Sequence, residues 1–198
     1  GAVSLTATDD SSISAIVGAA SVGVSFSIGG GVAVSVALSQ NTINSTVTAQ
    51  MAAANNGIAA SSVTLLAEES ATITATGVTA ALSGGLGAAS GGGADVKNDI
   101  TVVTTAQITG SDVDTGTGAI TITARDISVA SAETLSLSVS LGIGIAAGGS
   151  LSTSRINSTV LANLDGPDID AGQVTLLSVA KPKAYTMAMG VNAGALAI

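Results

Sequence analysis

One motif occurs four times in this chain and divides it into units that stack. Every copy places Val, Leu or Ile at its first and third positions, and the copies are spaced by 60, 57 and 54 residues. Units of this kind bury their apolar faces against their neighbours, so the chain extends in one direction. The motifs begin at Val3, Val63, Ile120 and Val174, which predicts repeats over 1–62, 63–119 and 120–173 and a truncated repeat over 174–198.

Between the motifs, large apolar and small residues alternate with the period of a β-strand. The alternation is clearest over 22–38 and returns over 80–94 and 135–149, each time with glycines. The sequence therefore predicts an all-β fold, a repetitive β-solenoid of the parallel β-helix type, in which a unit of about 57 residues makes three coils of about 19. The alternative is a stack of long antiparallel β-hairpins with two strands per repeat, which the same alternation allows.

The alternation in the first repeat also predicts a core and an outer face. The large residues are expected to form the repeat's own core, and the small ones a smooth face that contacts an adjoining repeat or another copy of the chain. The large set is Val22, Val24, Phe26, Ile28, Val32, Val34, Val36 and Leu38, and the small set is Gly23, Ser25, Ser27, Ala33, Ser35 and Ala37.

The stretch from Ser11 to Ala67 carries no charge, and hydropathy alone would suggest a membrane-spanning helix over 13–38. Serine and glycine at alternate positions argue against that helix, because glycine is unfavourable inside helices and the period is that of a strand. The chain begins and ends within strand-like patterns, which predicts that it is a piece of a longer protein.

Composition excludes several classes of function. Only 1% of the residues are aromatic and 9% charged, which is unlike an ordinary globular enzyme. The chain has no His and no Cys, so the usual nucleophilic triads and zinc sites are absent and no enzyme activity is expected. A net charge of -8 with five basic residues excludes nucleic acid as a partner. An acidic chain without Cys is compatible with an extracellular or cell-surface location.

Charged residues follow each motif directly. They are Asp9 and Asp10, Glu68 and Glu69, Arg125 and Asp126, and Lys181 and Lys183. Their recurrence predicts a solvent-facing corner in every repeat. A turn rich in Gly, Asp and Asn then precedes the next motif, at 55–57, 112–116 and 168–172.

Two of these turns carry aspartates at alternate positions, so both carboxylates of a turn lie on one face of an extended chain. Calcium prefers oxygen ligands of this kind, although neither of the common calcium-binding repeat patterns is present. Ordinary Asp-rich turns are the other interpretation. The candidate calcium ligands are Asp112, Asp114, Asp168 and Asp170, and no other cofactor is expected.

The order of features in each repeat resembles that of very large bacterial surface and secreted proteins. This order is the opening motif, a charged pair, a glycine-, alanine- and serine-rich apolar run, an Asn-x-Ile segment anchored at Ile43, Ile100 and Ile156, and an Asp/Gly turn. It resembles the repeats of filamentous-haemagglutinin-like adhesins and leukotoxin-type repeat exoproteins. The resemblance implies a β-solenoid stalk or surface fibre, with roles in adhesion or assembly.

The function expected from these observations is that of a structural repeat module of an extracellular bacterial surface protein. Such a module forms a stalk, fibre or sheath and supports adhesion or self-assembly, and its partners are copies of itself, neighbouring repeats, and a host or matrix receptor. One alternative is a binding module with a flat Thr/Ser face for polysaccharide or ice. The other is a membrane-active exotoxin repeat, suggested by the uncharged run.

Overall fold

The computed structural model describes residues 1–25, 29–52 and 57–194, and across these ranges it contains β-strands and no helix. The all-β prediction is therefore confirmed. Within the small and large sets named above, Phe26, Ser27 and Ile28 lie outside the described residues. So do Asn55 and Asn56 of the first predicted turn and residues 195–198 at the end of the fourth repeat.

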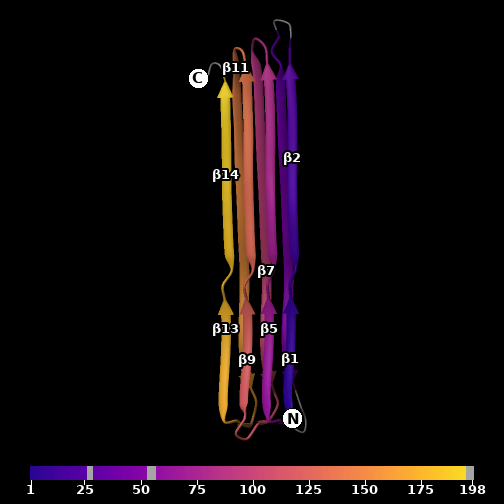
Figure 1. Cartoon of the computed structure of the whole chain (residues 1–198), viewed down its shortest axis with the longest axis vertical. Helices are drawn as coiled ribbons and strands as arrows, with labels where there is room; N and C mark the ends of the chain where they lie inside the picture. Colours follow the sequence, from indigo (N-terminus) through magenta and orange to yellow (C-terminus); the bar gives the residue numbers. More distant parts are fainter. Residues whose placement is uncertain (26–28, 53–56, 195–198) are drawn as a thin grey trace.

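Each repeat forms one tall, narrow rung of the stack. In the first three repeats the chain ascends through two strands in line, descends through one very long strand, and crosses the base in a short strand, whereas the fourth has the two ascending strands alone (Figure 1). The turn between the ascending and descending strands forms the tip of a rung. The first rung contains β1 (Ala2–Asp9), β2 (Ser12–Val24), β3 (Val32–Ala52) and β4 (Ile58–Ala59). The second contains β5 (Ser62–Glu69), β6 (Thr72–Gly84), β7 (Ala88–Thr109) and β8 (Val113–Asp114). The third contains β9 (Ala119–Asp126), β10 (Val129–Leu141), β11 (Gly144–Asp165) and β12 (Ile169–Asp170), and the fourth β13 (Gln173–Ala180) and β14 (Lys183–Gly194).

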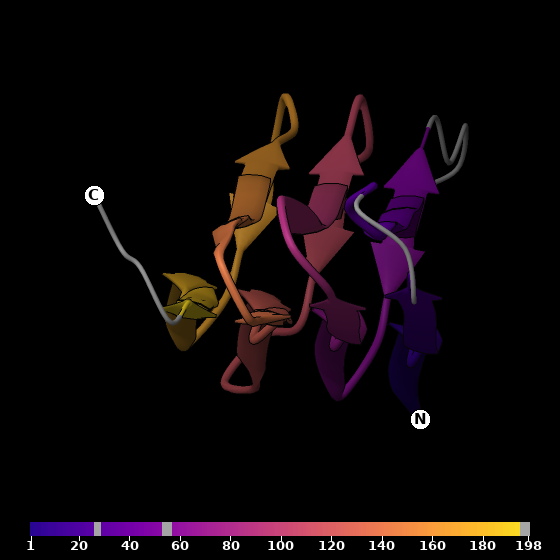
Figure 2. The same cartoon turned by 90° about the horizontal axis from the view of Figure 1, so that it is seen from above.

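Hydrogen bonds join equivalent strands of neighbouring rungs, and every pairing is parallel. The four sheets have the orders β1-β5-β9-β13, β14-β10-β6-β2, β11-β7-β3 and β12-β8-β4. In the first sheet the opening motifs lie in register, so that Val3, Val63, Ile120 and Val174 form one column. This is the parallel β-solenoid expected from the sequence. Figure 2, which looks along the strands, shows the rungs side by side in sequence order.

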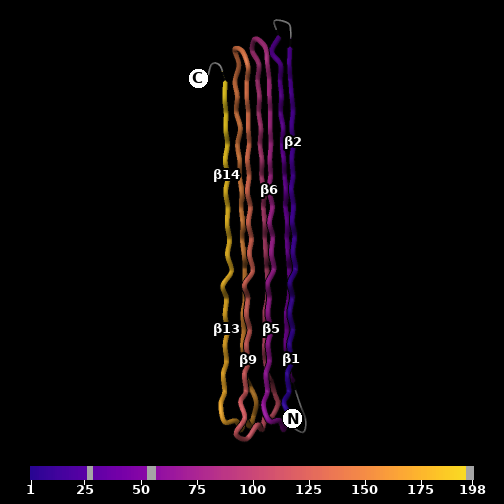
Figure 3. Tube along the Cα trace, viewed as in Figure 1, coloured from indigo at the N-terminus to yellow at the C-terminus, as the bar shows by residue number. Residues whose placement is uncertain are grey.

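Each solenoid coil is a whole repeat, so the expectation of three coils of about 19 residues per repeat is wrong. The ascending and descending strands of a rung do run in opposite directions, as in the hairpin alternative. They face each other across the interior, however, and their hydrogen bonds go to other rungs. The two prolines, Pro167 and Pro182, lie between strands and interrupt none of them. The long axis of the molecule therefore follows the strands, and the trace in Figure 3 places the narrow turns at its two ends.

The half of the stack nearer the base has an ordinary apolar interior. Val63, Leu65, Ile120 and Ile122 are fully buried there, and they pack with side chains of the descending strands such as Ile108. A second cluster follows above it around Ile43, Ile73 and Ile100. Threonine, asparagine and glutamine occupy many of the outward positions of these strands. Burial of these branched side chains stabilises the base half by the hydrophobic effect.

A buried amide pair continues this interior between the first two rungs. Asn98 is fully buried, and its amide nitrogen donates to the carbonyl oxygen of Ser131 at 2.7 Å. The amide nitrogen of Asn41 donates in turn to the side-chain oxygen of Asn98 at 2.9 Å. Hydrogen bonds of this kind make the burial of a polar side chain tolerable.

The half nearer the tips reverses this arrangement, so the prediction of the core over 22–38 is wrong. Val32, Val34, Val36 and Leu38 point outward and are 68%, 65%, 56% and 67% exposed, whereas Ala33, Ser35 and Ala37 point inward and are buried. Val22 and Val24 also point outward. The small residues, predicted to form an outer contact face, therefore line the interior.

The reversal follows from the continuity of the strands. In β3, the inward positions of the base half are occupied by Ile43, Val47 and Ala49, and every second residue from there toward the tip also points inward. A shift by one residue would bury the valines near the tip but would expose the isoleucine and valine near the base. Since the base half holds the larger side chains on both facing sheets, its packing determines which residues point inward along the whole strand.

Candidate functional site

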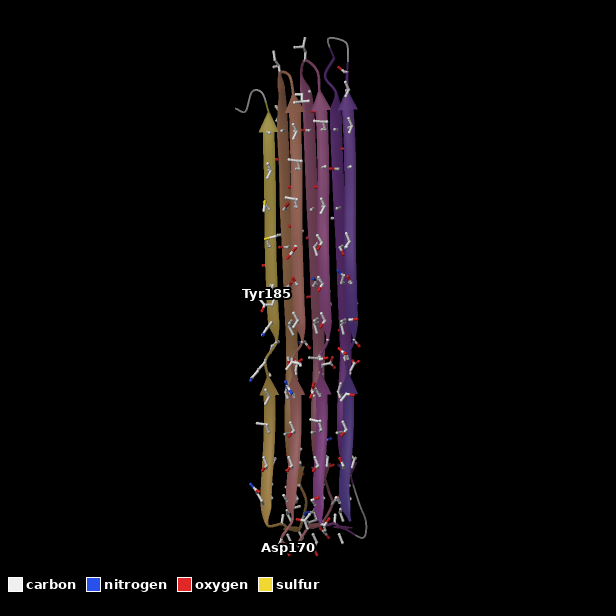
Figure 4. All side chains as sticks on the ribbon, in the orientation of Figure 1. Asp170 and Tyr185 are labelled. Carbon is white, nitrogen blue, oxygen red and sulfur yellow. The ribbon has the colours of Figure 1, made fainter. Side chains whose placement is uncertain are left out.

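The four aspartates predicted as calcium ligands lie at the base of the stack, where Figure 4 labels Asp170. Asp112, Asp114, Asp168 and Asp170 line one open hollow beside Gly57. Asp114 is in register with Asp170 of the next rung. One oxygen of Asp114 accepts a hydrogen bond from the backbone N–H of Gly116 at 2.9 Å, as in an ordinary Asx turn. Within the described ranges, no group of three or more acidic side chains is arranged to hold a metal ion, and calcium binding stays a prediction.

A second acidic group lies inside the stack, at the break between the two ascending strands of each rung. Asp9, Glu69 and Asp126 are in register and form one inward-pointing column, and Glu69 and Asp126 are fully buried. The expectation of a solvent-facing corner is therefore wrong for Asp9, Glu69 and Asp126, one charged residue in each of the first three repeats. The chain does not turn a corner there, and only the neighbouring residues, such as Glu68, point outward. The alternation along the strand is enough to predict that Asp9 points inward, since Asp9 has the same parity as Val3 and Leu5, which point inward.

Hydroxyl groups surround this carboxylate column. Asp9 accepts hydrogen bonds from Ser45 at 2.5 Å and from Ser11 at 2.8 Å, and these lower the pKa of its carboxyl below the ordinary value. Burial raises the pKa of Glu69, against the opposing effect of its contact with Ser45 at 2.7 Å. Asp126 accepts hydrogen bonds from the backbone N–H and the hydroxyl of Ser128.

Ser45 lies between the carboxyl groups of Asp9 and Glu69. A serine hydroxyl has one hydrogen, so Ser45 donates to only one of its two carboxyl neighbours at a time. If Glu69 carries a proton, it donates to Ser45 while Ser45 donates to Asp9, and both short contacts are then hydrogen bonds. The lowered pKa of Asp9 and the raised pKa of Glu69 agree with this arrangement.

The tip half, defined as the described residues of 17–38, 77–94, 134–150 and 188–194, is the third distinctive region. No residue in these ranges is charged. Its interior contains buried hydroxyls, among them Thr79, Ser83, Ser136 and Ser138. Inward glycines allow the two sheets to approach closely here, since a Cβ atom on Gly92 would lie 3.1 Å from the Ser138 hydroxyl and 3.3 Å from that of Thr79.

Large apolar side chains lie on the outside of the tip half, among glycines and alanines on the sheet that contains β3, β7 and β11. They come from both sheets and from the tip turns, and each is more than a third exposed. On one sheet they are Val22, Val24, Val78, Leu82, Leu135, Leu137, Leu141, Met189 and Val191; on the other Val32, Val34, Val36, Leu38 and Ile145; and at the tips Leu86 and Ile143. An apolar surface of this extent marks a region that contacts an apolar partner.

The outer face of the base half carries one continuous column of hydroxyl residues, Ser4, Thr64, Thr121 and Thr175. The next outward column contains Leu66 and Leu177 beside Thr6 and Thr123, so the threonine array is one column wide. A flat lattice-matching face for ice would need hydroxyls in adjacent columns as well.

The comparisons with protein families, with curated proteins and with solved structures found no match. None of the described residues belongs to a helix that could cross a membrane.

Proposed function

We propose that this chain is a structural repeat module of an extracellular bacterial surface protein. In this proposal the module acts as part of a stalk, fibre or sheath at the cell surface, supports adhesion or self-assembly, and catalyses no reaction. Its partners are further rungs, either from adjoining repeats or from other copies of the chain. Host or matrix receptors would bind to the assembled fibre.

The observation that carries the proposal is that the outermost strands of the stack have exposed edges. All sheet pairings are parallel and in register, so an added rung finds the same hydrogen-bonding pattern as an internal one. β2 lies at one edge of its sheet and β14 at the other, and nearly every residue of β14 is exposed. Exposed edges of this length pair readily with further strands unless charges or prolines protect them. Beyond Lys183, β14 has neither.

The geometry of β14 allows a specific test. The backbone N–H of Lys183 donates to the carbonyl oxygen of Ser128 in the neighbouring rung, so by the alternation of a parallel strand the N–H of Thr186 points to the free edge. Thr186→Pro removes that edge donor without breaking a hydrogen bond within the chain. Thr186→Ala keeps the donor and is the matched control.

The measurement is electron microscopy of the purified chain in lipid-free buffer, with circular dichroism to confirm the strand content. We expect rods or filaments from the parent and from Thr186→Ala, and shorter or no filaments from Thr186→Pro. A parent that stays monomeric at high concentration, or a Thr186→Pro variant that assembles like the parent, would contradict growth through this edge.

A further inference from the structure

We propose that the tip half of this protein inserts into the hydrocarbon layer of a lipid bilayer, while the base half stays in water. The inference rests on the proposed function in one respect, because the sheet edges within the bilayer must be paired by further rungs. It concerns different surfaces, namely the two outer faces and the tips.

The distribution of the apolar residues favours lipid over a second copy of the chain. A second copy stacked on one face would cover Val34 and Val36, or on the opposite face Leu135 and Leu137, but it would leave the tip residue Leu86 in water. Hydrocarbon surrounds both faces and the tips at once. In β6 and β10 the outward residues of the tip half are apolar while buried hydroxyls point inward, which is the arrangement an apolar solvent favours and water opposes.

The height of the tip half matches a bilayer. The part of β6 from Gly77 to Gly84 rises by about 26 Å at about 3.3 Å per residue, and the tip turn adds to this. The hydrocarbon layer is about 30 Å thick. The uncharged segments therefore extend through most of that layer.

Three charged side chains and one tyrosine lie below the tip half. Glu133 and Asp95 are the charged residues nearest to the tips in β10 and β7, and Lys183 lies at the start of β14. Tyr185, half-exposed, lies two residues after Lys183 and three residues before the tip half begins, at the height labelled in Figure 4. Tyrosine is enriched at membrane–water interfaces, and lysine side chains near the boundary reach toward water.

The backbone at the tips satisfies a second requirement of the bilayer, where unpaired N–H and C=O groups are costly. The N–H groups of Gly85 and Gly87 donate to the carbonyl oxygens of Leu141 and Ile143 in the next rung, at 3.0 and 2.6 Å. The N–H of Ser25 donates to Gly84 at 3.2 Å. The tip turns thus continue the ladder between rungs.

Flotation with vesicles of phosphatidylcholine tests the proposal, because a neutral lipid removes electrostatic attraction. The test variant carries Val36→Asp on one sheet and Leu137→Asp on the other. The matched control carries Thr101→Asp and Thr64→Asp, which are outward positions of the same two faces in the base half. All four changes lie on the outside, and circular dichroism confirms that each variant keeps its strands.

We expect the parent and the control to float with the vesicles, and the Val36→Asp/Leu137→Asp variant to bind at least about tenfold more weakly, because a charge in hydrocarbon is strongly unfavourable. Tyr185 is the only tyrosine and tryptophan is absent, so its emission reports depth. We expect bromine atoms near the headgroup end of the acyl chains to quench this emission more than bromines near the bilayer centre.

The proposal is overturned if the parent stays at the bottom of the gradient, if the double aspartate variant floats as well as the parent, or if deep bromines quench Tyr185 best. It is also overturned if the double aspartate changes disperse filaments in lipid-free buffer, since another copy would then cover these faces. If the chain forms filaments that do not bind vesicles, lipid insertion is contradicted and the proposed function is not. Vesicle binding by a chain that forms no filaments contradicts assembly through the edges instead.

Discussion

Glu69 is in register with Asp126 of the next rung, and both side chains are fully buried, so two carboxyl groups lie one strand spacing apart inside the protein. One oxygen of each has no hydrogen-bond partner among the described residues. Burying two adjacent negative charges is highly unfavourable, and the charge of Asp126 adds to burial in raising the pKa of Glu69. Within this column, burial and neighbouring negative charges raise the pKa of Glu69.

This arrangement predicts that the protein is less stable at pH 7 than at mildly acidic pH. The folded state holds the proton of Glu69 to a higher pH than the unfolded chain, whose ordinary value is 4.5. The resulting contribution to the free energy of unfolding is complete below that pH and is lost as the pH rises through the raised pKa. Asp9 acts oppositely: hydrogen bonds lower its pKa from 3.8, so its contribution is present above that pH and is lost as the pH falls.

Glu69→Gln isolates the effect, because the amide keeps the shape of the side chain without its charge. We expect the variant to be more stable than the parent at pH 7 by about 1 to 3 kcal/mol, and this difference to shrink toward pH 5. Urea unfolding at a series of pH values measures it. Glu68→Gln is the control, since Glu68 points outward to Arg125 at 3.7 Å, and it should change stability little. Equal pH profiles for the parent and Glu69→Gln would contradict the prediction.

Two leucines test the reversal of inside and outside along the ascending strands. Leu65→Ala creates a cavity in the fully buried base half and should lower the free energy of unfolding by about 2 to 5 kcal/mol. Leu137→Ala removes the same atoms from an outward position in the tip half and should cost less than about 1 kcal/mol in lipid-free buffer. Urea unfolding measures the free energy of unfolding of both variants. Similar decreases in the two would contradict the outward placement of Leu137.

Neighbouring glycines in β7 provide a test of the close approach between sheets. Gly92 points inward, where a Cβ atom would come within 3.3 Å of the Leu137 carbonyl oxygen, whereas at Gly93 the nearest atom is the Gly149 carbonyl oxygen at 4.0 Å. We expect Gly92→Val to destabilise the fold by about 1 to 3 kcal/mol through overpacking. Gly93→Val should be neutral or stabilising, because valine favours strands. Thermal unfolding monitored by circular dichroism compares the stabilities of the two variants. If Gly92→Val is as stable as the parent, the close approach of the sheets at Gly92 is contradicted.

The register of Asp114 with Asp170 gives the calcium prediction a test. Like charges directly opposite each other on neighbouring strands repel, so Asp170→Asn should raise stability by about 0.2 to 1 kcal/mol in the presence of a chelator. If the aspartates bind calcium, millimolar calcium raises the Tm of the parent and has a smaller effect on Asp170→Asn. Thermal unfolding with and without calcium measures both. A parent Tm that calcium leaves unchanged would favour ordinary turns.

The repeat and the strands follow from the amino-acid sequence alone. The motif positions Val3, Val63, Ile120 and Val174 recur at spacings that lie in register in the structure, and the period of two is visible in each repeat. Both features are local, since the period of a strand depends on backbone geometry and the register on the recurrence of similar side chains. The candidate calcium ligands also follow from local spacing, and in the structure they line one hollow.

Which residues of each strand point inward depends on how the sheets pack against each other. Alternation defines two faces of a strand but not which of them is buried. In β3 the large apolar residues of the two halves lie on opposite faces, with Ile43 and Val47 on one and Val34 and Val36 on the other. A strand without a bulge has one inward parity along its whole length, so the half with more apolar volume on both facing sheets prevails. That choice exposes the valines of the tip half and draws Asp9, Glu69 and Asp126 into the interior.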